Sequence, residues 1–285
     1  MVSRLQSIFA RLARPSIVTY QDLNVEVLGP DSGPAILFLH GWGSRGQNLR
    51  PLADALSNTY ACHILDLPGH GRSPNPPEPW GLREHADLLK DYMENEIGRP
   101  VTVLGHSNGG RIALYMASSP DVSARIERLI LISPSGVKPA RSLGYHVRSG
   151  LASILKAPFS ILPAPLRDPA LDWLRHSLVW RMLGSSDYNT LSGVMRETFV
   201  KTVTHHLDDD LPRVHVPTLL FWGTSDAAVS RRQMTVMETA IPDCGLVELE
   251  GAGHYGHLDA FPTVLTATRH FLEETTTGVS EPSSP

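Results

Sequence analysis

The chain has 285 residues, enough for one large α/β domain with an insertion or for two domains. Its formal net charge of −4 includes no basic excess, so we expect no nucleic-acid partner. No apolar stretch approaches the roughly 20 residues that span a bilayer. Cys62 and Cys244 are the two cysteines; their wide separation argues against a disulfide framework or a structural zinc site and suits a reducing, cytoplasmic compartment.

Residues 1–15 predict a short basic amphipathic helix. Four apolar residues recur at helical spacing and three arginines carry its charge: Leu5, Ile8, Phe9 and Leu12; Arg4, Arg11 and Arg14. One interpretation is a weak contact with a membrane surface, or a transit-like segment. The interpretation we favour is a terminal helix that packs on the body or frays.

The chain then alternates strand patterns with helix patterns. Two alternating runs between residues 16 and 29 predict antiparallel strands at a sheet edge. Continuous apolar or β-branched runs predict buried strands at 35–39, 60–65, 101–104, 129–132, 218–222 and 246–249. Amphipathic spacing predicts helices at 48–56, 82–97, 111–118, 231–240 and 261–273. This alternation favours a mostly parallel sheet covered by helices on both faces.

The rhythm breaks between residues 136 and 217, where helical patterns are separated by proline and glycine. We expect this segment to be a helical cap inserted into a core formed by residues 16–135 and 218–274. Its apolar residues suggest an apolar pocket: Leu151, Leu155, Phe159, Leu171, Trp173, Leu174, Leu178 and Trp180. The tail, residues 275–285, has the composition of a disordered segment.

The pentapeptide Gly-His-Ser-Asn-Gly at residues 105–109 stands between a strand pattern and a helix pattern. In that context G-x-S-x-G predicts a nucleophile elbow, a strained turn that exposes the hydroxyl of Ser107 at the start of a helix. A serine hydroxyl is a poor nucleophile at neutral pH. It therefore needs a base, a carboxylate that orients the base, and donors for the developing oxyanion.

His254 is the predicted base, because it follows a strand and a glycine turn in the loop before the last helix. His257, three residues later, is the nearest rival. Asp226, after the strand at 218–222, is the predicted carboxylate; the alternative position, after the preceding strand, holds Ser133 and no acid. Asp226 is expected to accept the Nδ1–H of His254.

The oxyanion is expected to bind two backbone amides, those of Asn108 and Trp42. The Trp42 ring is expected either to line an acyl pocket or to pack in the core. His40 and His106 are interpreted as structural, with the His106 side chain directed away from the nucleophile.

Two further segments contain residue types that also occur in phosphate-binding loops and metal sites. Residues 66–73 form a glycine-rich turn without the spacing of a phosphate loop, and Asp66 is expected to form local bonds there. His205 and His206, beside the acidic run at 208–210, are expected to lie on a solvated edge rather than bind metal. We therefore expect no metal and no cofactor.

These motifs resemble the α/β-hydrolase superfamily, in the branch with a helical cap. The matching segments are HGWG (40–43), DLPGHGRS (66–73), GHSNGG (105–110), GTSD (223–226) and GAGH (251–254). HGWG is similar to the loop of carboxyl-ester hydrolases of the pimeloyl methyl ester esterase type, whereas Asn108 departs from the apolar residue or Gln often found after the nucleophile. The resemblance implies an α/β-hydrolase fold with a mostly parallel, eight-stranded sheet.

The resemblance also implies a serine hydrolase that cleaves a small to medium carboxylic ester through an acyl-enzyme. A serine, rather than an aspartate, favours attack on acyl carbon. The alternatives are a C–C bond hydrolase of ring-cleavage products or a perhydrolase with the same triad. A third is a ligand-binding receptor that keeps the fold with little turnover.

Overall fold

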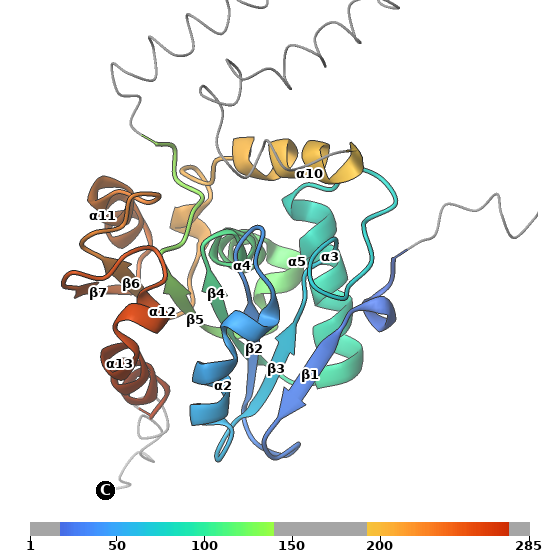
Figure 1. Cartoon of the computed structure of the whole chain (residues 1–285), viewed down its shortest axis with the longest axis horizontal. Helices are drawn as coiled ribbons and strands as arrows, with labels where there is room; N and C mark the ends of the chain where they lie inside the picture. Colours follow the sequence, from blue (N-terminus) through green and yellow to red (C-terminus); the bar gives the residue numbers. More distant parts are fainter. Residues whose placement is uncertain (1–17, 140–192, 274–285) are drawn as a thin grey trace, which may run out of the picture.

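The computed structural model describes residues 18–139 and 193–273 (Figure 1). These residues form one sheet with strand order β1-β3-β2-β4-β5-β6-β7. The strands are β1 (Val25–Leu28), β2 (Ala35–Leu39), β3 (Ala61–Leu65), β4 (Val101–His106), β5 (Ile126–Ile132), β6 (Thr218–Gly223) and β7 (Cys244–Leu249). β1 is antiparallel to β3, and all other neighbours are parallel. The predicted α/β class and mostly parallel sheet are confirmed.

Helices cover both faces of this sheet. They are α2 (Arg50–Leu56), α3 (Leu82–Tyr92), α4 (Asn108–Ser118), α5 (Pro120–Ser123), α10 (Gly193–Thr204), α11 (Arg231–Ala240), α12 (Gly256–Asp259) and α13 (Phe261–Glu273). Shorter turns complete the set: 3-10 turns at Tyr20–Asp22, Gly46–Asn48 and Leu211–Arg213, and a π-helical turn at Met93–Ile97.

The strands alternate their side chains between two hydrophobic clusters. In β2, all five residues are buried: Leu37 and Leu39 pack with α3, α4 and α11, whereas Ile36 and Phe38 pack with α2 and α13. A strand that is apolar on both sides needs cover on both sides. The continuous apolar runs in the sequence therefore place the central strands between two layers of helices.

The described residues form seven strands, one fewer than the eight expected. The first of the two predicted edge strands, at residues 16–20, does not form in its described part, residues 18–20. Tyr20–Asp22 forms a 3-10 turn instead. The Asp22 carboxylate accepts hydrogen bonds from the backbone N–H and the hydroxyl of Thr19, each at 2.8 Å. These two local bonds close a turn where a strand would need the chain to be extended.

α10 begins at residue 193 of the predicted cap and crosses above α4 (Figure 1). Hydrogen bonds tie it to the loop before α3: the backbone N–H of Trp80 donates to the Thr198 hydroxyl at 3.1 Å, and Lys201 Nζ donates to the Pro79 carbonyl at 2.7 Å. No strand forms at residues 136–139 or 193–217. Residues 140–192, which hold the other predicted cap helices and the apolar cap residues, lie outside the described part, as do the predicted helix at 1–15 and the tail at 275–285.

Candidate active site

Ser107 occupies the turn between β4 and α4, at φ 52° and ψ −110°. A positive φ is uncommon for a residue with a side chain. The turn is also tightly packed. A Cβ atom at Gly105 would lie 2.7 Å from the Gly110 backbone, and one at Gly109 would lie 2.1 Å from the Leu39 carbonyl oxygen. The two glycines of the pentapeptide therefore allow the backbones of strand and helix to meet behind the serine.

Three side chains from distant parts of the chain meet at this turn. His254 Nε2 lies 3.0 Å from Ser107 Oγ, and His254 Nδ1 lies 2.9 Å from Asp226 Oδ2. An ionised carboxylate only accepts hydrogen bonds, so Nδ1 carries the proton and donates to Asp226. Nε2 then has a free lone pair, which accepts a hydrogen bond from the Ser107 hydroxyl. This geometry can remove a proton from the serine oxygen.

The Asp226 carboxylate is fully buried and has several donors. Its side chain is 0 % exposed, and Oδ1 accepts backbone N–H groups from Ala228 at 2.7 Å and Val229 at 3.0 Å. Burial by itself would raise the pKa of Asp226. The hydrogen bonds from His254, Val229 and Ala228 favour the charged form and leave the pKa below its ordinary value. The carboxylate therefore stays ionised beside the imidazole.

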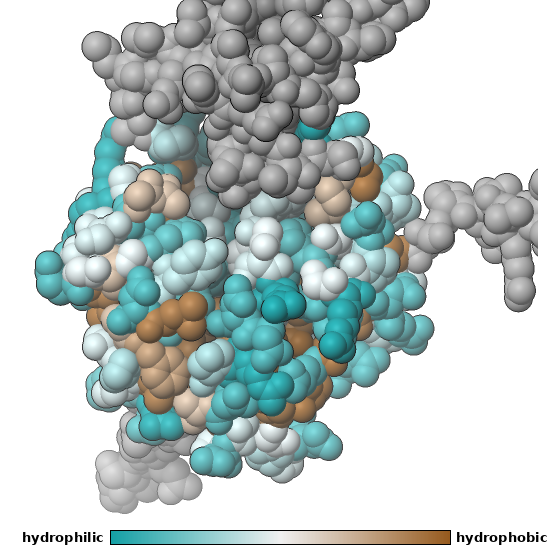
Figure 2. All heavy atoms as spheres, in the orientation of Figure 1, coloured by the Kyte–Doolittle hydropathy of each residue, from teal (hydrophilic) through white to brown (hydrophobic). Residues whose placement is uncertain are grey.

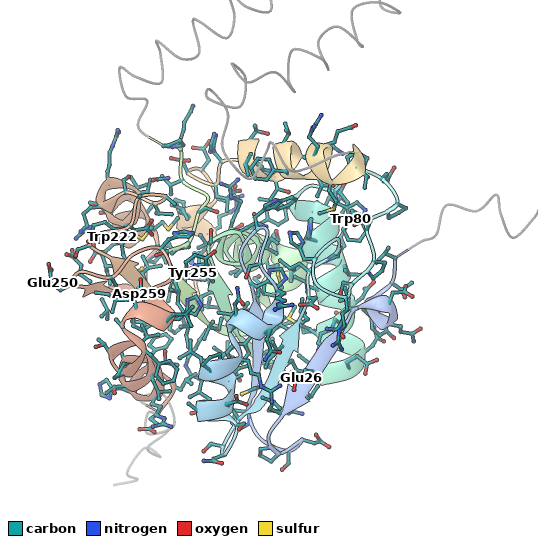
Figure 3. The ribbon with its side chains drawn as sticks, viewed as in Figure 1. Glu26, Trp80, Trp222, Glu250, Tyr255 and Asp259 are labelled. Atoms are coloured by element: carbon teal, nitrogen blue, oxygen red, sulfur yellow. The ribbon has the colours of Figure 1, made fainter. Side chains whose placement is uncertain are left out.

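The loop that carries His254 is held by hydrogen bonds to the side chains of Asp259 and His106. Asp259 Oδ2 accepts the backbone N–H of Gly253 at 2.9 Å, and His106 Nε2 lies 3.0 Å from the His254 carbonyl oxygen. Figure 3 labels Tyr255 and Asp259, which mark this loop beside the sheet. Figure 2 shows apolar side chains gathered on this face around α12, where Leu258 is 48 % exposed.

His257, the rival base, is buried in α12 and its ring lies 4.8 Å from that of His106. Burial, together with the nearby His254, lowers its pKa to about 4. Within the described residues it forms no hydrogen bond with Ser107 or Asp226. His254, and not His257, is therefore the histidine that bridges the serine and the acid.

The loop after β2 passes close to the serine. The Leu67 N–H donates to His40 Nε2 at 2.9 Å, so His40 Nδ1 carries the proton and donates to the Gly41 carbonyl at 2.7 Å. Burial lowers the pKa of His40 to about 4 and keeps it neutral. A Cβ atom on Gly41 would lie 3.2 Å from Ser107 Cβ. His40 thus fixes this loop against the turn after β3.

Trp42 and Asn108 are the residues that directly follow Gly41 and Ser107 in the chain. The Trp42 ring packs edge-on against His70, with centroids 4.9 Å apart, and against Phe199 of α10 at 5.0 Å. Asn108 is the first residue of α4 and is 4 % exposed, with a side-chain oxygen that accepts no hydrogen bond from the described residues. Its backbone N–H is one of the first in the helix, which have no partner within the helix.

The Asp66 carboxylate joins three segments, whereas only local bonds were expected. Oδ1 accepts the Gly46 N–H at 2.8 Å; Oδ2 accepts the Arg72 N–H at 2.9 Å and the Asn24 side-chain amide at 2.8 Å. The bond from Arg72 is the predicted local one. The other two connect the turn with Asn24, the residue before β1, and with the loop after β2, so Asp66 supports the rim of the site.

Neither His205 nor His206 belongs to a metal-binding group in the described part of the chain. The His205 ring packs against Tyr115 with centroids 5.5 Å apart, and Asp208 accepts the Lys138 N–H at 3.1 Å. Asp210 forms an ion pair with Arg213. At residues 18–139 and 193–273, no three His, Cys, Asp or Glu side chains are arranged to hold a metal ion.

Arg111 is a buried residue of the site that the sequence analysis missed. It is 6 % exposed, donates from Nε to the Ser135 hydroxyl at 3.2 Å, and donates from Nη1 to the Thr202 carbonyl near the end of α10. Burial lowers its pKa to about 10, which leaves it charged at neutral pH. A cation is favourable at a helix C-terminus, where carbonyl groups lack partners. The signal in the sequence was a lone charge within an otherwise apolar helix pattern.

Comparison with known proteins agrees with this geometry. The model of the Alpha/beta hydrolase family matches residues 36–267. The pimeloyl-[acyl-carrier protein] methyl ester esterase of Chromobacterium violaceum is 27 % identical to this chain, and the alignment covers 88 % of this chain and 98 % of that protein. The protein of the same name from Neisseria meningitidis is 28 % identical, and the alignment covers 86 % of this chain and 95 % of that protein. A bacterial membrane phospholipase A has a similar structure, with a TM-score of 0.69 and 24 % identity over 92 % of this chain and 86 % of that chain.

Proposed function

Because this chain belongs to the alpha/beta hydrolase family, we propose that it is a serine hydrolase that cleaves a small to medium carboxylic ester through an acyl-enzyme. The observation that carries the proposal is the continuous chain of hydrogen bonds from Ser107 Oγ through His254 to Asp226, at 3.0 Å and 2.9 Å. That arrangement serves nucleophilic attack on an acyl carbon.

In the proposed reaction, His254 Nε2 takes the Ser107 proton as Oγ attacks the ester carbonyl. Asp226 accepts the Nδ1–H throughout and stabilises the imidazolium that forms. The imidazolium then gives its proton to the leaving alkoxide, and the acyl group stays on Oγ. Water, deprotonated by His254, then attacks the acyl carbon. The bond from the acyl carbon to Oγ breaks, the imidazolium returns the proton to Oγ, and the carboxylic acid is released with Ser107 and His254 restored.

The proposed oxyanion hole consists of the backbone N–H groups of Asn108 and Trp42. Asn108 opens α4, where unpartnered N–H groups and the helix dipole favour negative charge. Trp42 follows Gly41, whose backbone lies against Ser107. Removing one such donor in other serine hydrolases costs about 10²- to 10³-fold in kcat.

Curated relatives support an ester as the substrate. Two of them, from Chromobacterium violaceum and Neisseria meningitidis, are named methyl ester esterases, and the alignments span nearly their full lengths. We therefore propose methyl esters of medium-length acyl chains as the first substrates to examine.

A substrate panel tests this function. Methyl and p-nitrophenyl esters of graded acyl length are compared with a vinylogous diketone, the substrate of C–C hydrolases, and with a perhydrolysis assay. We expect ester turnover to dominate and the Ser107→Ala variant to lose on the order of 10⁴-fold or more, while Ser123→Ala, a serine outside the site, keeps full activity. Faster cleavage of the diketone, or ester turnover that survives Ser107→Ala, would refute the proposal.

A further inference from the structure

The His106 side chain lies between the loop that carries His254 and the loop after β2, although His106 is not one of the proposed catalytic groups. It is the last residue of β4, adjacent to Ser107, and is 2 % exposed. Its Nε2 atom is 3.0 Å from the His254 carbonyl oxygen. A carbonyl oxygen can only accept, so Nε2 carries the proton and donates it. The proposed base is thus tied through its backbone to the neighbour of the nucleophile.

The same ring also contacts the loop after β2. A Cβ atom on Gly41 would lie 3.0 Å from His106 Nδ1 and 3.2 Å from Ser107 Cβ, so only a glycine fits against the ring without displacing it. Gly41 directly precedes Trp42, the proposed oxyanion donor. One imidazole therefore separates the segment that would supply an oxyanion donor from the segment that supplies the base.

Aromatic packing holds the ring in place. The centroid of His106 lies 5.0 Å from that of His254, 5.0 Å from that of Tyr255 and 4.8 Å from that of His257. These contacts leave the ring little freedom to rotate away from the His254 carbonyl. A displacement of His106 would move the backbone of His254 and, with it, the imidazole that accepts the Ser107 hydroxyl.

We propose that His106 is a positioning residue that sets the distance between the base, His254, and the nucleophile, Ser107, by a hydrogen bond to the backbone of the base. This inference rests on the proposed serine hydrolase function. It assigns to His106 no contact with substrate and no proton transfer. Its role is to keep His254 Nε2 within hydrogen-bond reach of Ser107 Oγ, where it now lies at 3.0 Å.

The role is geometric because His106 stays neutral. Burial, together with the nearby His257 and His254, lowers its pKa to about 3; the hydrogen bond to the His254 backbone and the charge of Asp226 act in the opposite direction. The ring therefore stays uncharged across the neutral pH range. Substitution of His106 should change the rate without adding an ionisation to the pH profile.

Two substitutions separate the shape of the ring from its hydrogen bond. His106→Phe keeps a ring of similar size but has no donor, whereas His106→Gln places an amide N–H near the position of Nε2. The matched control is His63→Phe in β3, away from the site. It removes another buried imidazole, whose Nδ1 atom lies 2.8 Å from the hydroxyl of Tyr92 in α3. Each variant is compared at a temperature where circular dichroism shows it to be folded.

We expect His106→Phe to lower kcat about 10- to 100-fold, the loss typical of a misplaced catalytic group, with KM and the shape of the pH profile unchanged. His106→Gln should recover most of the rate, and His63→Phe should lower the melting temperature without lowering kcat. A kcat of His106→Phe within about twofold of the wild type would overturn the inference. Equal losses in kcat for His63→Phe and His106→Phe would also overturn it, and so would a kcat of His106→Gln as low as that of His106→Phe.

Labelling with a fluorophosphonate separates failure of this inference from failure of the proposed function, because the reagent needs an activated serine but no particular ester. If the wild type is not labelled at Ser107, the proposed function fails and the role of His106 fails with it. If the wild type is labelled and His106→Phe is labelled equally fast, only the positioning role is refuted. Slow labelling of His106→Phe beside fast labelling of His63→Phe supports both.

Discussion

At the scale of single residues, the strained backbone of Ser107 is held by hydrogen bonds on both sides. Its N–H donates to the Ile132 carbonyl at 3.0 Å, and its carbonyl accepts N–H groups from Arg111 and Ser135, each at 3.1 Å. A residue with a side chain at positive φ costs about 1–3 kcal/mol and persists where its surroundings over-determine it. These three bonds explain how the serine stays in the conformation that presents its hydroxyl.

Asp226→Asn tests the role of the carboxylate. The amide of Asn can donate to His254 Nδ1, which favours the tautomer with the proton on Nε2, so Nε2 can no longer accept the Ser107 hydroxyl. We expect kcat for ester hydrolysis to fall about 10⁴-fold, the effect of the equivalent change in other triads. The control is Asp87→Asn, at an exposed acid on α3. A loss smaller than about tenfold would show that Asp226 does not set the tautomer.

At the scale of elements, the sequence predicted the central strands and several helices well. The strand expected at 218–222 is β6 (Thr218–Gly223), and the helix expected at 261–273 is α13 (Phe261–Glu273). Apolar runs and helical periodicity were sufficient there because burial decides both structures. The helix expected at 82–97 is α3 followed by a π-helical turn, closed by a bond from the Gly98 N–H to the Met93 carbonyl at 2.8 Å. Periodicity alone does not separate these two helix types.

The site was predictable in its linear order but not in its supporting contacts. Strand ends in a parallel sheet meet at one edge, so Ser107, Asp226 and His254 were expected together from their places after strands. The bond from His106 to the His254 carbonyl joins residues 148 positions apart and depends on how one loop packs against another. Hydrophobic patterns carry no information about such a bond. The same holds for the contact of Arg111 with α10.

Gly109→Ala tests the packing of the elbow between β4 and α4. The added Cβ would lie 2.1 Å from the Leu39 carbonyl oxygen, so strand and helix must separate. We expect a loss of about 3 kcal/mol in the free energy of unfolding, at the upper end of typical overpacking, measured by urea denaturation. Gly245→Ala in β7 is the matched control, since nothing lies within 4 Å of its added Cβ. Equal stability of the two variants would contradict the tight elbow.

At the scale of the whole molecule, the described core holds five buried histidines whose burial lowers their pKa to about 4 or below. They are His40, His63, His85, His106 and His257. In the unfolded chain each would bind a proton near pH 6.5. Between that pH and about 4 the unfolded state therefore binds more protons than the folded state, and the protein loses stability as the pH falls.

We expect the free energy of unfolding to fall steeply below about pH 6.5, by about 1.4 kcal/mol per pH unit for each histidine that is protonated only in the unfolded state. Urea denaturation at a series of pH values measures this slope. His63→Phe should reduce this slope by about 1.4 kcal/mol per pH unit, the contribution of one proton, because the ring at position 63 can no longer bind one. Stability that stays constant from pH 7 to pH 4.5 would show that these histidines are not held neutral in the folded protein.

The central claim is that the Ser107 oxygen becomes covalently acylated. Mass spectrometry of protein quenched during turnover of p-nitrophenyl acetate tests it most directly. We predict a mass increase of one acetyl group on the peptide that contains Ser107, absent from Ser107→Ala and strongly reduced in His254→Ala. Hydrolysis of the ester by the wild type with no acetyl group on that peptide, or with the group on another residue, would contradict the account.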